Sequence, residues 1–357
     1  MVKSIRAGFL GAGSIAKSHA YALDALKFYY KDIPKIERIV VASPTPESRE
    51  TFANRFGFKE AIPPDEIWGR DDLDVLYILG INQTHTPQLI KAALMPSVQR
   101  IYVEKPISTS LEEMHDLETL DNRDHGKFIM VGFQYLQKSP LRQALAHWRS
   151  GAFGEPVHFR AEYLHSSYLD PAYREARQQR IAPAPINGAL VDLGSHIISL
   201  IIAFLGNALV VKSASAKSTI DTVNVDSDLC TTALLEESTS GAVGTLTASR
   251  ISAGTGDHLS LEIRGTRGAL IFNTSQPDMY ESFLPDEGWR RHEVSSDYKP
   301  DSKFPSGYSP SGWLRALIHN HYLFLGGKPG ISFLPDLAHG IQAQKLLLQI
   351  TDLILKG

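Results

Sequence analysis

The chain has 357 residues, of which 43% are hydrophobic and 21% are charged, and its formal net charge is −3. This length predicts two domains, and the composition is typical of a globular protein with sizeable hydrophobic cores. Acidic and basic residues are interspersed, with no basic stripe that would neutralise phosphates, so we expect no nucleic-acid partner.

Residues 1–134 alternate short apolar runs with helical patterns. The apolar runs predict strands at residues 5–10, 38–42, 75–79, 101–103 and 128–133. Helical spacing or helix-start residues between these runs predict helices at 14–26, 47–56 and 87–94, and one that begins near 110. Continuous apolar strands separated by helices indicate a parallel sheet covered on both faces. We therefore expect an α/β fold whose first domain, residues 1–134, is doubly wound.

Residues 135–357 follow a different pattern. Helical spacing predicts helices at 140–149, 189–205, 312–325 and 334–355. An alternating strand is expected at 156–163, and strand-like segments between 210 and 273 indicate an open antiparallel sheet. The polar stretch 166–187 and the segment 274–310, which is rich in Pro, Ser, Asp and Gly, predict loops. We expect residues 135–357 to form a second domain built around this sheet.

The sequence predicts a cytoplasmic protein. Residues 1–6 lead straight into the first strand, without the apolar run and small-residue cleavage site of a secretory signal. The most apolar stretch, residues 197–205, is far shorter than the roughly 20 residues that span a bilayer, so we expect no membrane partner. The single cysteine, Cys230, cannot form an internal disulfide, and its apolar neighbours favour a buried strand residue over a reactive thiol.

A glycine motif, Gly11-Ala12-Gly13-Ser14-Ile15-Ala16, lies between the first predicted strand and the first predicted helix. The first glycine permits a tight turn, and the second lets the backbone approach a pyrophosphate. The helix that follows offers unpaired N–H groups to phosphates. The motif predicts dinucleotide binding at Gly11, Gly13, Ser14 and Ile15, and the alternative is a purely structural turn.

The second predicted strand ends in Ala42-Ser43-Pro44-Thr45, without the carboxylate that binds the adenosine ribose in many such domains. The missing acid removes the repulsion against a 2′-phosphate, which Ser43, Thr45 and Arg49 could bind. We therefore expect NADP in preference to NAD as the cofactor. Alternatively, Arg49 is simply a solvated helix residue.

Two further segments carry candidate catalytic groups. Lys105, in Glu104-Lys105-Pro106, directly follows a strand whose carboxyl end should border the ligand crevice, although this tripeptide alone fits a surface lysine better. Asp192 and His196 are four residues apart in an otherwise apolar helix, so both could face one substrate. Histidine titrates near neutrality and suits proton removal from an alcohol. A capping aspartate beside a core histidine is the alternative.

These segments together resemble the Gfo/Idh/MocA oxidoreductase family, in the same order and at similar separations. The resemblance covers nearly the whole chain and is carried by the glycine motif, Glu104-Lys105-Pro106, residues 188–196, Asn82 and His85, residues 150–157 and residues 261–270. It implies a Rossmann domain at residues 1–134. It also implies that residues 135–357 bind substrate and form a homodimer or homotetramer through a large, mostly antiparallel sheet.

The resemblance implies an NAD(P)-dependent enzyme that transfers a hydride between nicotinamide and a secondary alcohol or carbonyl of a sugar, inositol or related polyol. Lys105 would polarise the reacting oxygen, His196 would be the general base, and Asp192 would position the substrate. Glu104 would fix Lys105 and the nicotinamide end of the site. The resemblance also assigns Asn82, His85, Glu104 and Lys105 to cofactor binding, and no metal is expected.

Departures from the family pattern leave the substrate open. Gly80-Ile81 and Ser199 replace a frequent Thr-Pro and a frequent second acid of the family. The candidate pocket residues ahead of the catalytic helix, each of which could equally be a packing or surface residue, are Tyr163, His165, Tyr168 and Arg174. The alternatives to a dehydrogenase are a non-catalytic NAD(P)-sensing regulator on the same fold and an enzyme of redox-assisted glycoside cleavage.

Overall fold

The computed structural model describes residues 4–123, 125–181, 187–220, 223–294, 298–299, 302, 304 and 312–356. The chain divides into two compact units. Unit 1 comprises Met1–Gln137, Asp297–Gly307 and Gly312–Ile341, and unit 2 comprises Lys138–Ser296, Tyr308–Ser311 and Gln342–Gly357. The functional boundary between residues 134 and 135 stays a prediction.

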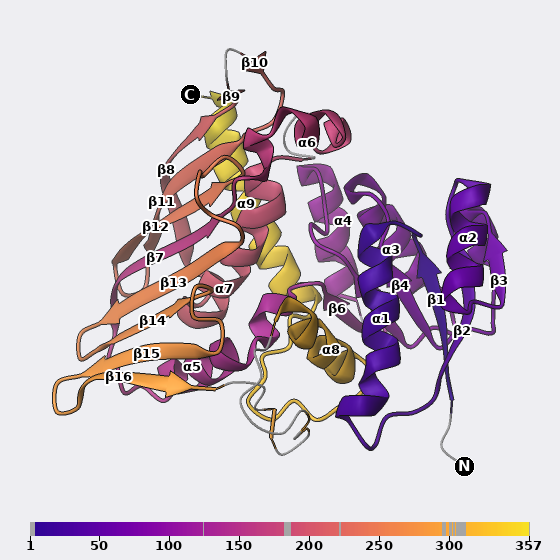
Figure 1. The fold of residues 1–357 in the computed structure, drawn as a ribbon, viewed down its shortest axis with the longest axis horizontal. Coiled ribbons are helices and arrows are strands. Elements are labelled where there is room, and N and C mark those ends of the chain that lie inside the picture. Colours follow the sequence, from indigo (N-terminus) through magenta and orange to yellow (C-terminus); the bar gives the residue numbers. More distant parts are fainter. Residues whose placement is uncertain are drawn as a thin grey trace. The chain divides into compact units, whose positions relative to one another are not determined.

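Unit 1 contains a six-stranded parallel sheet in the order β3-β2-β1-β4-β5-β6, which confirms the doubly wound fold (Figure 1). Its strands are β1 (Ile5–Leu10), β2 (Ile36–Ala42), β3 (Glu60–Ile62), β4 (Val75–Ile78), β5 (Arg100–Val103) and β6 (Phe128–Val131). The sequence analysis missed β3, because its three residues include a charged side chain and form no apolar run.

The helices of unit 1 are α1 (Ser14–Tyr29), α2 (Pro46–Phe56), α3 (His85–Ala93), α4 (Leu111–Asp121) and α8 (Trp313–Phe324). Helix α8 comes from near the end of the chain and packs beside α1 (Figure 1). It contributes apolar residues such as Leu317 and Phe324 to the core around β1 and β4. Helix α8 also buries the polar side chains of Arg315, His319, Asn320 and His321.

Unit 2 contains an eight-stranded sheet in the order β16-β15-β14-β13-β7-β12-β11-β8, in which only the β7–β12 pair is parallel among the described pairings. This confirms the mostly antiparallel open sheet. Its strands are β7 (Pro156–Leu164), β8 (Leu209–Lys217), β11 (Cys230–Glu237), β12 (Ala242–Ser249), β13 (His258–Gly265), β14 (Ala269–Asn273), β15 (Met279–Leu284) and β16 (Gly288–Glu293). A short two-stranded sheet pairs β9 (Thr219–Ile220) with β10 (Val223–Asn224).

Hairpin β15–β16 lies where the sequence predicts a loop. Its composition is turn-like, but β15 pairs with β14 at the edge of the sheet, and this pairing supplies backbone hydrogen bonds that composition does not reveal. Tyr280 of β15 stacks on His292 of β16, with ring centroids 4.4 Å apart. Strand formation here is therefore decided by neighbouring strands.

One face of this sheet is covered by α5 (Ser139–Arg149), α7 (Ser195–Leu205) and the part of α9 (Leu337–Lys356) that belongs to unit 2 (Figure 1). In the described part of unit 2, no helix covers the other face. A short helix, α6 (Pro171–Glu175), interrupts the stretch in which the sequence predicts a loop. None of the helices that the structure describes is both long and apolar enough to cross a membrane.

Candidate active site

The glycine motif forms the turn between β1 and α1 in unit 1. Gly11 has φ +119°, and a Cβ atom there would lie 2.6 Å from the carbonyl oxygen of Leu79, so the turn requires glycine. Gly13 is the N-cap residue just before α1, and a Cβ atom on it would meet nothing within 4 Å. The backbone at Gly13 is therefore open to a ligand, and Ser14 and Ile15 form the first turn of α1 behind it.

The end of β2 brings Ser43, Thr45 and Arg49 into one turn. Thr45 precedes the first residue of α2, and Arg49 lies on the second turn of that helix. The Nη1 atom of Arg49 donates to the carbonyl oxygens of Ser43 and Pro44 at 3.1 and 3.2 Å. These bonds hold the guanidinium against the turn where the sequence analysis places the adenosine ribose.

His85 ties two loops of unit 1 together. Asn82 lies in a 3-10 turn just before α3, and His85 is the first residue of α3 and is only 1% exposed. Its Nδ1 atom lies 2.6 Å from the carbonyl oxygen of Pro106, and its Nε2 atom lies 3.2 Å from that of Gly80. Burial lowers the pKa of His85, and the bond to Pro106 partly offsets this effect. His85 therefore supports the backbone beside Lys105.

Glu104 and Lys105 leave β5 together but have different surroundings. Lys105 is half-buried, whereas Glu104 is 5% exposed. The carboxylate of Glu104 accepts a hydrogen bond from Nε2 of His19, on α1, at 3.0 Å. A Cβ atom at Gly132 would lie 2.7 Å from Oε1 of Glu104, so this glycine leaves room for the carboxylate.

Asp192 lies in a π-helical turn, Leu190–Gly194, that precedes α7. The sequence analysis assumed a regular α-helix, in which residues four apart share a face, whereas a π-helical turn changes that spacing. Asp228 holds the start of this turn, because its carboxylate accepts from the backbone N–H of Leu190 at 2.8 Å. A Cβ atom at Gly188 would collide with the same carboxylate. These contacts explain why glycine precedes the turn.

Arg250 is a functional candidate that the sequence analysis missed. It directly follows β12, its side chain is buried, and its Nη2 atom donates to Oδ2 of Asp192 at 2.9 Å. Its Nη1 atom donates to the carbonyl oxygen of Arg180 at 2.7 Å, and its guanidinium lies over the ring of Tyr168 at 4.6 Å. The available signal was an arginine at the end of a strand with alternating apolar residues.

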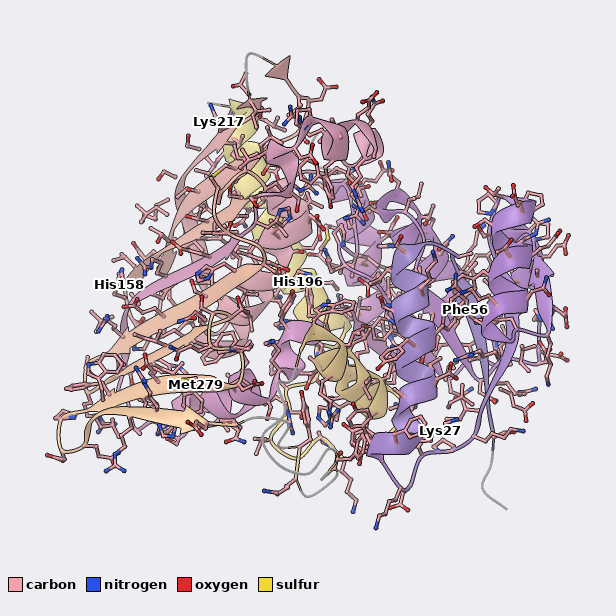
Figure 2. The ribbon with its side chains drawn as sticks, viewed as in Figure 1. Lys27, Phe56, His158, His196, Lys217 and Met279 are labelled. Atoms are coloured by element: carbon pink, nitrogen blue, oxygen red, sulfur yellow. The ribbon has the colours of Figure 1, made fainter. Side chains whose placement is uncertain are left out.

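Tyr163, His165 and Tyr168, which are predicted pocket residues of unit 2, make ring contacts with His196 or with one another. His196 lies on α7 (Figure 2) and is 6% exposed. Its ring centroid lies 6.0 Å from that of Tyr163, on β7. The ring of His165 lies 6.2 Å from that of Tyr168. Burial lowers the pKa of His165, Asp192 opposes this shift, and Arg250 reinforces it.

Arg174 has a local role in the described structure. Its Nη1 atom donates to the carbonyl oxygens of Tyr168 and Leu169 at 2.6 and 3.1 Å. The side chain therefore stabilises the loop that carries Tyr168. Thus Asp192, His165 and Tyr168 are brought together by Arg250, whereas Arg174 bonds to the backbone beside them.

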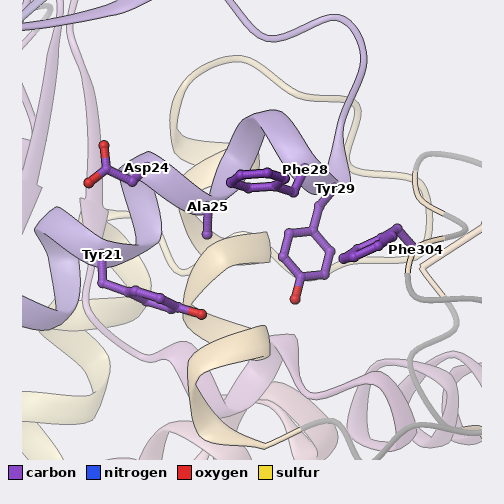
Figure 3. A pocket seen from close by; sticks show the side chains of 6 residues that line it. All are labelled: Tyr21, Asp24, Ala25, Phe28, Tyr29 and Phe304. Atoms are coloured by element: carbon purple, nitrogen blue, oxygen red, sulfur yellow. The ribbon is translucent and has the colours of Figure 1, made fainter.

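A hollow of about 240 Å³ lies elsewhere in unit 1, at the far end of α1 (Figure 3). It is lined by Tyr21, Asp24, Ala25, Phe28, Tyr29 and Phe304, none of which belongs to the predicted site. Within the described residues, no group of three or more His, Cys, Asp or Glu side chains is arranged to hold a metal ion.

Two parts of the chain match known protein domains. Residues 5–133 match the oxidoreductase family with an NAD-binding Rossmann fold, and residues 141–271 match the C-terminal domain of Gfo/Idh/MocA proteins. The chain belongs to the Gfo/Idh/MocA family of oxidoreductases. The glycine motif, Glu104-Lys105-Pro106 and residues 188–196 predicted this family.

Several relatives of the chain have names that state an activity. Levoglucosan dehydrogenase of Pseudarthrobacter phenanthrenivorans is 27% identical, over 96% of this chain and 94% of the relative. The scyllo-inositol 2-dehydrogenase (NAD(+)) of Bacillus subtilis is 24% identical, over 77% of this chain and 75% of the relative. A solved structure of levoglucosan dehydrogenase in complex with NADH has a TM-score of 0.87 at 24% identity, covering 99% of this chain and 98% of that chain. This last likeness shows a common fold.

Proposed function

We propose that this protein is an NAD(P)-dependent dehydrogenase that oxidises a secondary alcohol of a sugar, inositol or related polyol, or reduces the corresponding carbonyl. The observation that carries the proposal is the presence of Lys105, Asp192 and His196 in the segments by which the chain resembles the family. Lys105 follows β5 in the nucleotide-binding unit, and unit 2 carries His196 with an Asp192 that a buried arginine holds. Residues 1–134 would bind the dinucleotide, and residues 135–357 would bind the substrate.

In the proposed reaction, Lys105 donates a hydrogen bond from Nζ to the reacting oxygen and stabilises the charge that develops there. His196 accepts the hydroxyl proton during oxidation and returns it during reduction. Asp192 accepts a hydrogen bond from a substrate hydroxyl while Arg250 fixes its orientation. The nicotinamide, when bound, accepts or supplies the hydride. Glu104, Asn82 and His85 support the nicotinamide end of the site.

For the substrate class, we propose a ring-shaped polyol without a charged group. The relatives named for levoglucosan and scyllo-inositol act on compounds of this kind, and the first of them aligns along nearly the whole chain. Tyr163, His165 and Tyr168 offer aromatic faces and ring edges that suit the C–H and O–H groups of a sugar ring. Levoglucosan and the inositols are therefore the first compounds to test.

For the cofactor, we propose a preference for NADP(H) over NAD(H). The support is the absence of a carboxylate at the end of β2, together with Arg49 held beside Ser43 at 3.1 Å. The NADH in the structure of levoglucosan dehydrogenase favours the opposite preference, so both cofactors must be compared directly. Fluorescence titration with each cofactor, repeated with Arg49→Ala, decides between them.

We also propose that the protein is a homodimer or homotetramer through the uncovered face of the unit 2 sheet. This face carries Val210 on β8, Leu234 on β11 and Val243 on β12, each more than 40% exposed. His158 of β7 pairs with Val243 and is exposed on the same face (Figure 2). Sedimentation of the protein and of Leu234→Lys tests this, because a charge at this position would weaken an apolar interface.

The decisive experiment for the activity is a panel of sugars and polyols incubated with each cofactor, with absorbance at 340 nm as the readout. Turnover of at least one neutral polyol is expected. Cofactor binding without turnover of any member would contradict the proposal and favour an NAD(P)-sensing regulator. Formation of product from a glycoside without net change at 340 nm would instead indicate redox-assisted cleavage.

A further inference from the structure

A chain of buried polar groups crosses the core of unit 1 and ends at Glu104. Nε2 of His19 lies 3.0 Å from Oε1 of Glu104, and Nδ1 of His19 lies 2.8 Å from Nε2 of His321. Nδ1 of His321 lies 3.2 Å from the hydroxyl of Tyr77. His19, His321 and Tyr77 are each 0% exposed. Four elements that are distant in sequence, α1, α8, β4 and the end of β5, thus meet in one hydrogen-bonded chain.

The hydrogen-bonded chain determines whether Nε2 of His19 donates or accepts a hydrogen bond. A carboxylate oxygen accepts hydrogen bonds and a ring N–H donates them, so Nε2 of His19 donates to Oε1 of Glu104. Burial lowers the pKa of His321 well below its usual value, and the nearby His19 acts in the same direction. His321 in turn holds the ring of His19, because its Nε2 contacts the nitrogen opposite the one that faces Glu104.

Glu104 is confined on its other side as well. Its backbone N–H donates to the carbonyl oxygen of Ile78 at 3.0 Å, and its carboxylate packs against Gly132 at the end of β6. A buried carboxylate that loses its donor pays the desolvation cost without compensation and tends to move toward water. The orientation of Glu104, and of the Lys105 that follows it, therefore depends on His19.

The hydrogen-bonded chain also connects the two parts of the predicted cofactor site within unit 1. His19 lies on α1 only four residues beyond Ile15, which belongs to the glycine motif. Glu104 and Lys105 are the groups assigned to the nicotinamide end. The hydrogen bond between His19, on α1, and Glu104 holds the predicted pyrophosphate-binding turn in a fixed position relative to the residues at the predicted nicotinamide end.

We propose that His19 and His321 are positioning residues that hold Glu104, and through it Lys105, in the geometry needed for hydride transfer. This inference rests on the proposed function. The same core contains a natural comparison, because Nδ2 of Asn320 donates to the hydroxyl of Tyr102 at 2.8 Å. That pair joins α8 to β5 and is equally buried, but its hydrogen bond runs from Asn320 to Tyr102 and does not involve the carboxylate of Glu104.

The test compares His19→Phe, which removes the donor, with His19→Gln, which keeps an N–H group near the position of Nε2. Tyr102→Phe is the matched control, because it removes one buried hydrogen bond from the same core. We expect His19→Phe to lower kcat by at least about tenfold with little change in KM, and His19→Gln to recover most of the loss. Tyr102→Phe should keep kcat within about twofold of the unmodified protein, even if its Tm falls as much as that of His19→Phe.

A second variant approaches Glu104 from the opposite side. Gly132→Ala places a methyl group against the carboxylate, so it should lower kcat as His19→Phe does while leaving the His19–His321 contact in place. Equal kcat values in His19→Phe and the unmodified protein would overturn the proposal. So would a loss in Tyr102→Phe as large as that in His19→Phe.

The dissociation constant of NAD(P)H, measured by fluorescence, separates this inference from the proposed function. If the unmodified protein binds cofactor but turns over no polyol, the proposed function fails. The positioning role of His19 is then tested by cofactor binding alone. Weaker cofactor binding in His19→Phe, with recovery in His19→Gln and none of the loss in Tyr102→Phe, would support the positioning role. In that case of no polyol turnover, identical dissociation constants in all of these proteins would overturn it.

Discussion

Arg250 donates from Nη2 to Oδ2 of Asp192 over 2.9 Å, and its side chain is 1% exposed. The guanidinium of Arg250 is buried, whereas 24% of the side chain of Asp192 stays exposed. The second cation near Asp192, Arg180, lies at 3.5 Å and is half-exposed, so it restrains Asp192 less. Arg250 therefore restrains Asp192 more than Arg180 does.

Arg250→Met should lower kcat/KM for the preferred polyol by about tenfold to a hundredfold, because Asp192 loses its fixed orientation. The free energy of unfolding should fall by about 2 kcal/mol, since a buried bond is lost. Steady-state kinetics and urea unfolding measure both effects. Arg180→Met is the matched control and should change kcat/KM by less than about threefold. Equal losses in the two variants would argue against a special role for Arg250.

Lys105→Ala and His196→Ala should each lower kcat by about a hundredfold or more, because each removes a group that handles charge or a proton on the reacting oxygen. Cofactor dissociation constants should change little, which fluorescence titration checks. Lys91→Ala removes an exposed lysine from α3 in the same unit and should leave kcat unchanged. Full activity in both catalytic variants would eliminate the proposed roles.

Gly11→Ala and Gly13→Ala should fail in different ways. At Gly11, positive φ and the nearby Leu79 carbonyl make any side chain strained. Tm should therefore fall, and the free energy of unfolding should drop by about 2 kcal/mol or more. At Gly13 the backbone has φ −83° and open space, so Tm should change little while the cofactor binds about tenfold more weakly. Thermal unfolding and cofactor titration together distinguish the two. Unchanged cofactor affinity in Gly13→Ala would remove Gly13 from the site.

Stability should fall as the pH drops below about 6.5. Burial lowers the pKa of His147 and His292 from the ordinary value of 6.5, and His147 lowers that of His292 further. The unfolded chain therefore holds more protons than the folded one between the folded and unfolded pKa values. The stabilisation is complete above the unfolded pKa and is lost as the pH falls through this window.

Urea unfolding at pH 7.5 and pH 5.5 measures this dependence. His292→Gln should reduce the difference between the two conditions, because Gln does not titrate and can still bond to Ser282, whose Oγ lies 2.8 Å from Nε2 of His292. His258→Gln is the matched control, because His258 also contacts a serine hydroxyl, that of Ser275, but that contact is solvent-exposed. A pH dependence that is the same in all three proteins would rule out this pair as a source.

The sequence alone determined the features that depend on local patterns. Apolar periodicity predicted five of the six strands of the unit 1 sheet, and the Gly11–Gly13 spacing predicted the turn that follows β1. The order of the three motifs identified the family, which the matches to both domains confirmed. These features are local because side-chain period and turn geometry are set by neighbours in the chain.

Tertiary structure alone decided how the buried polar groups are paired. Arg250 meets Asp192 across 58 residues, and His321 meets His19 across 302, so no local pattern points from one partner to the other. The π-helical turn at Leu190–Gly194 likewise departs from the regular spacing on which the sequence analysis relied. A buried polar group must find a partner, but which partner it finds depends on the remote segments that pack against it.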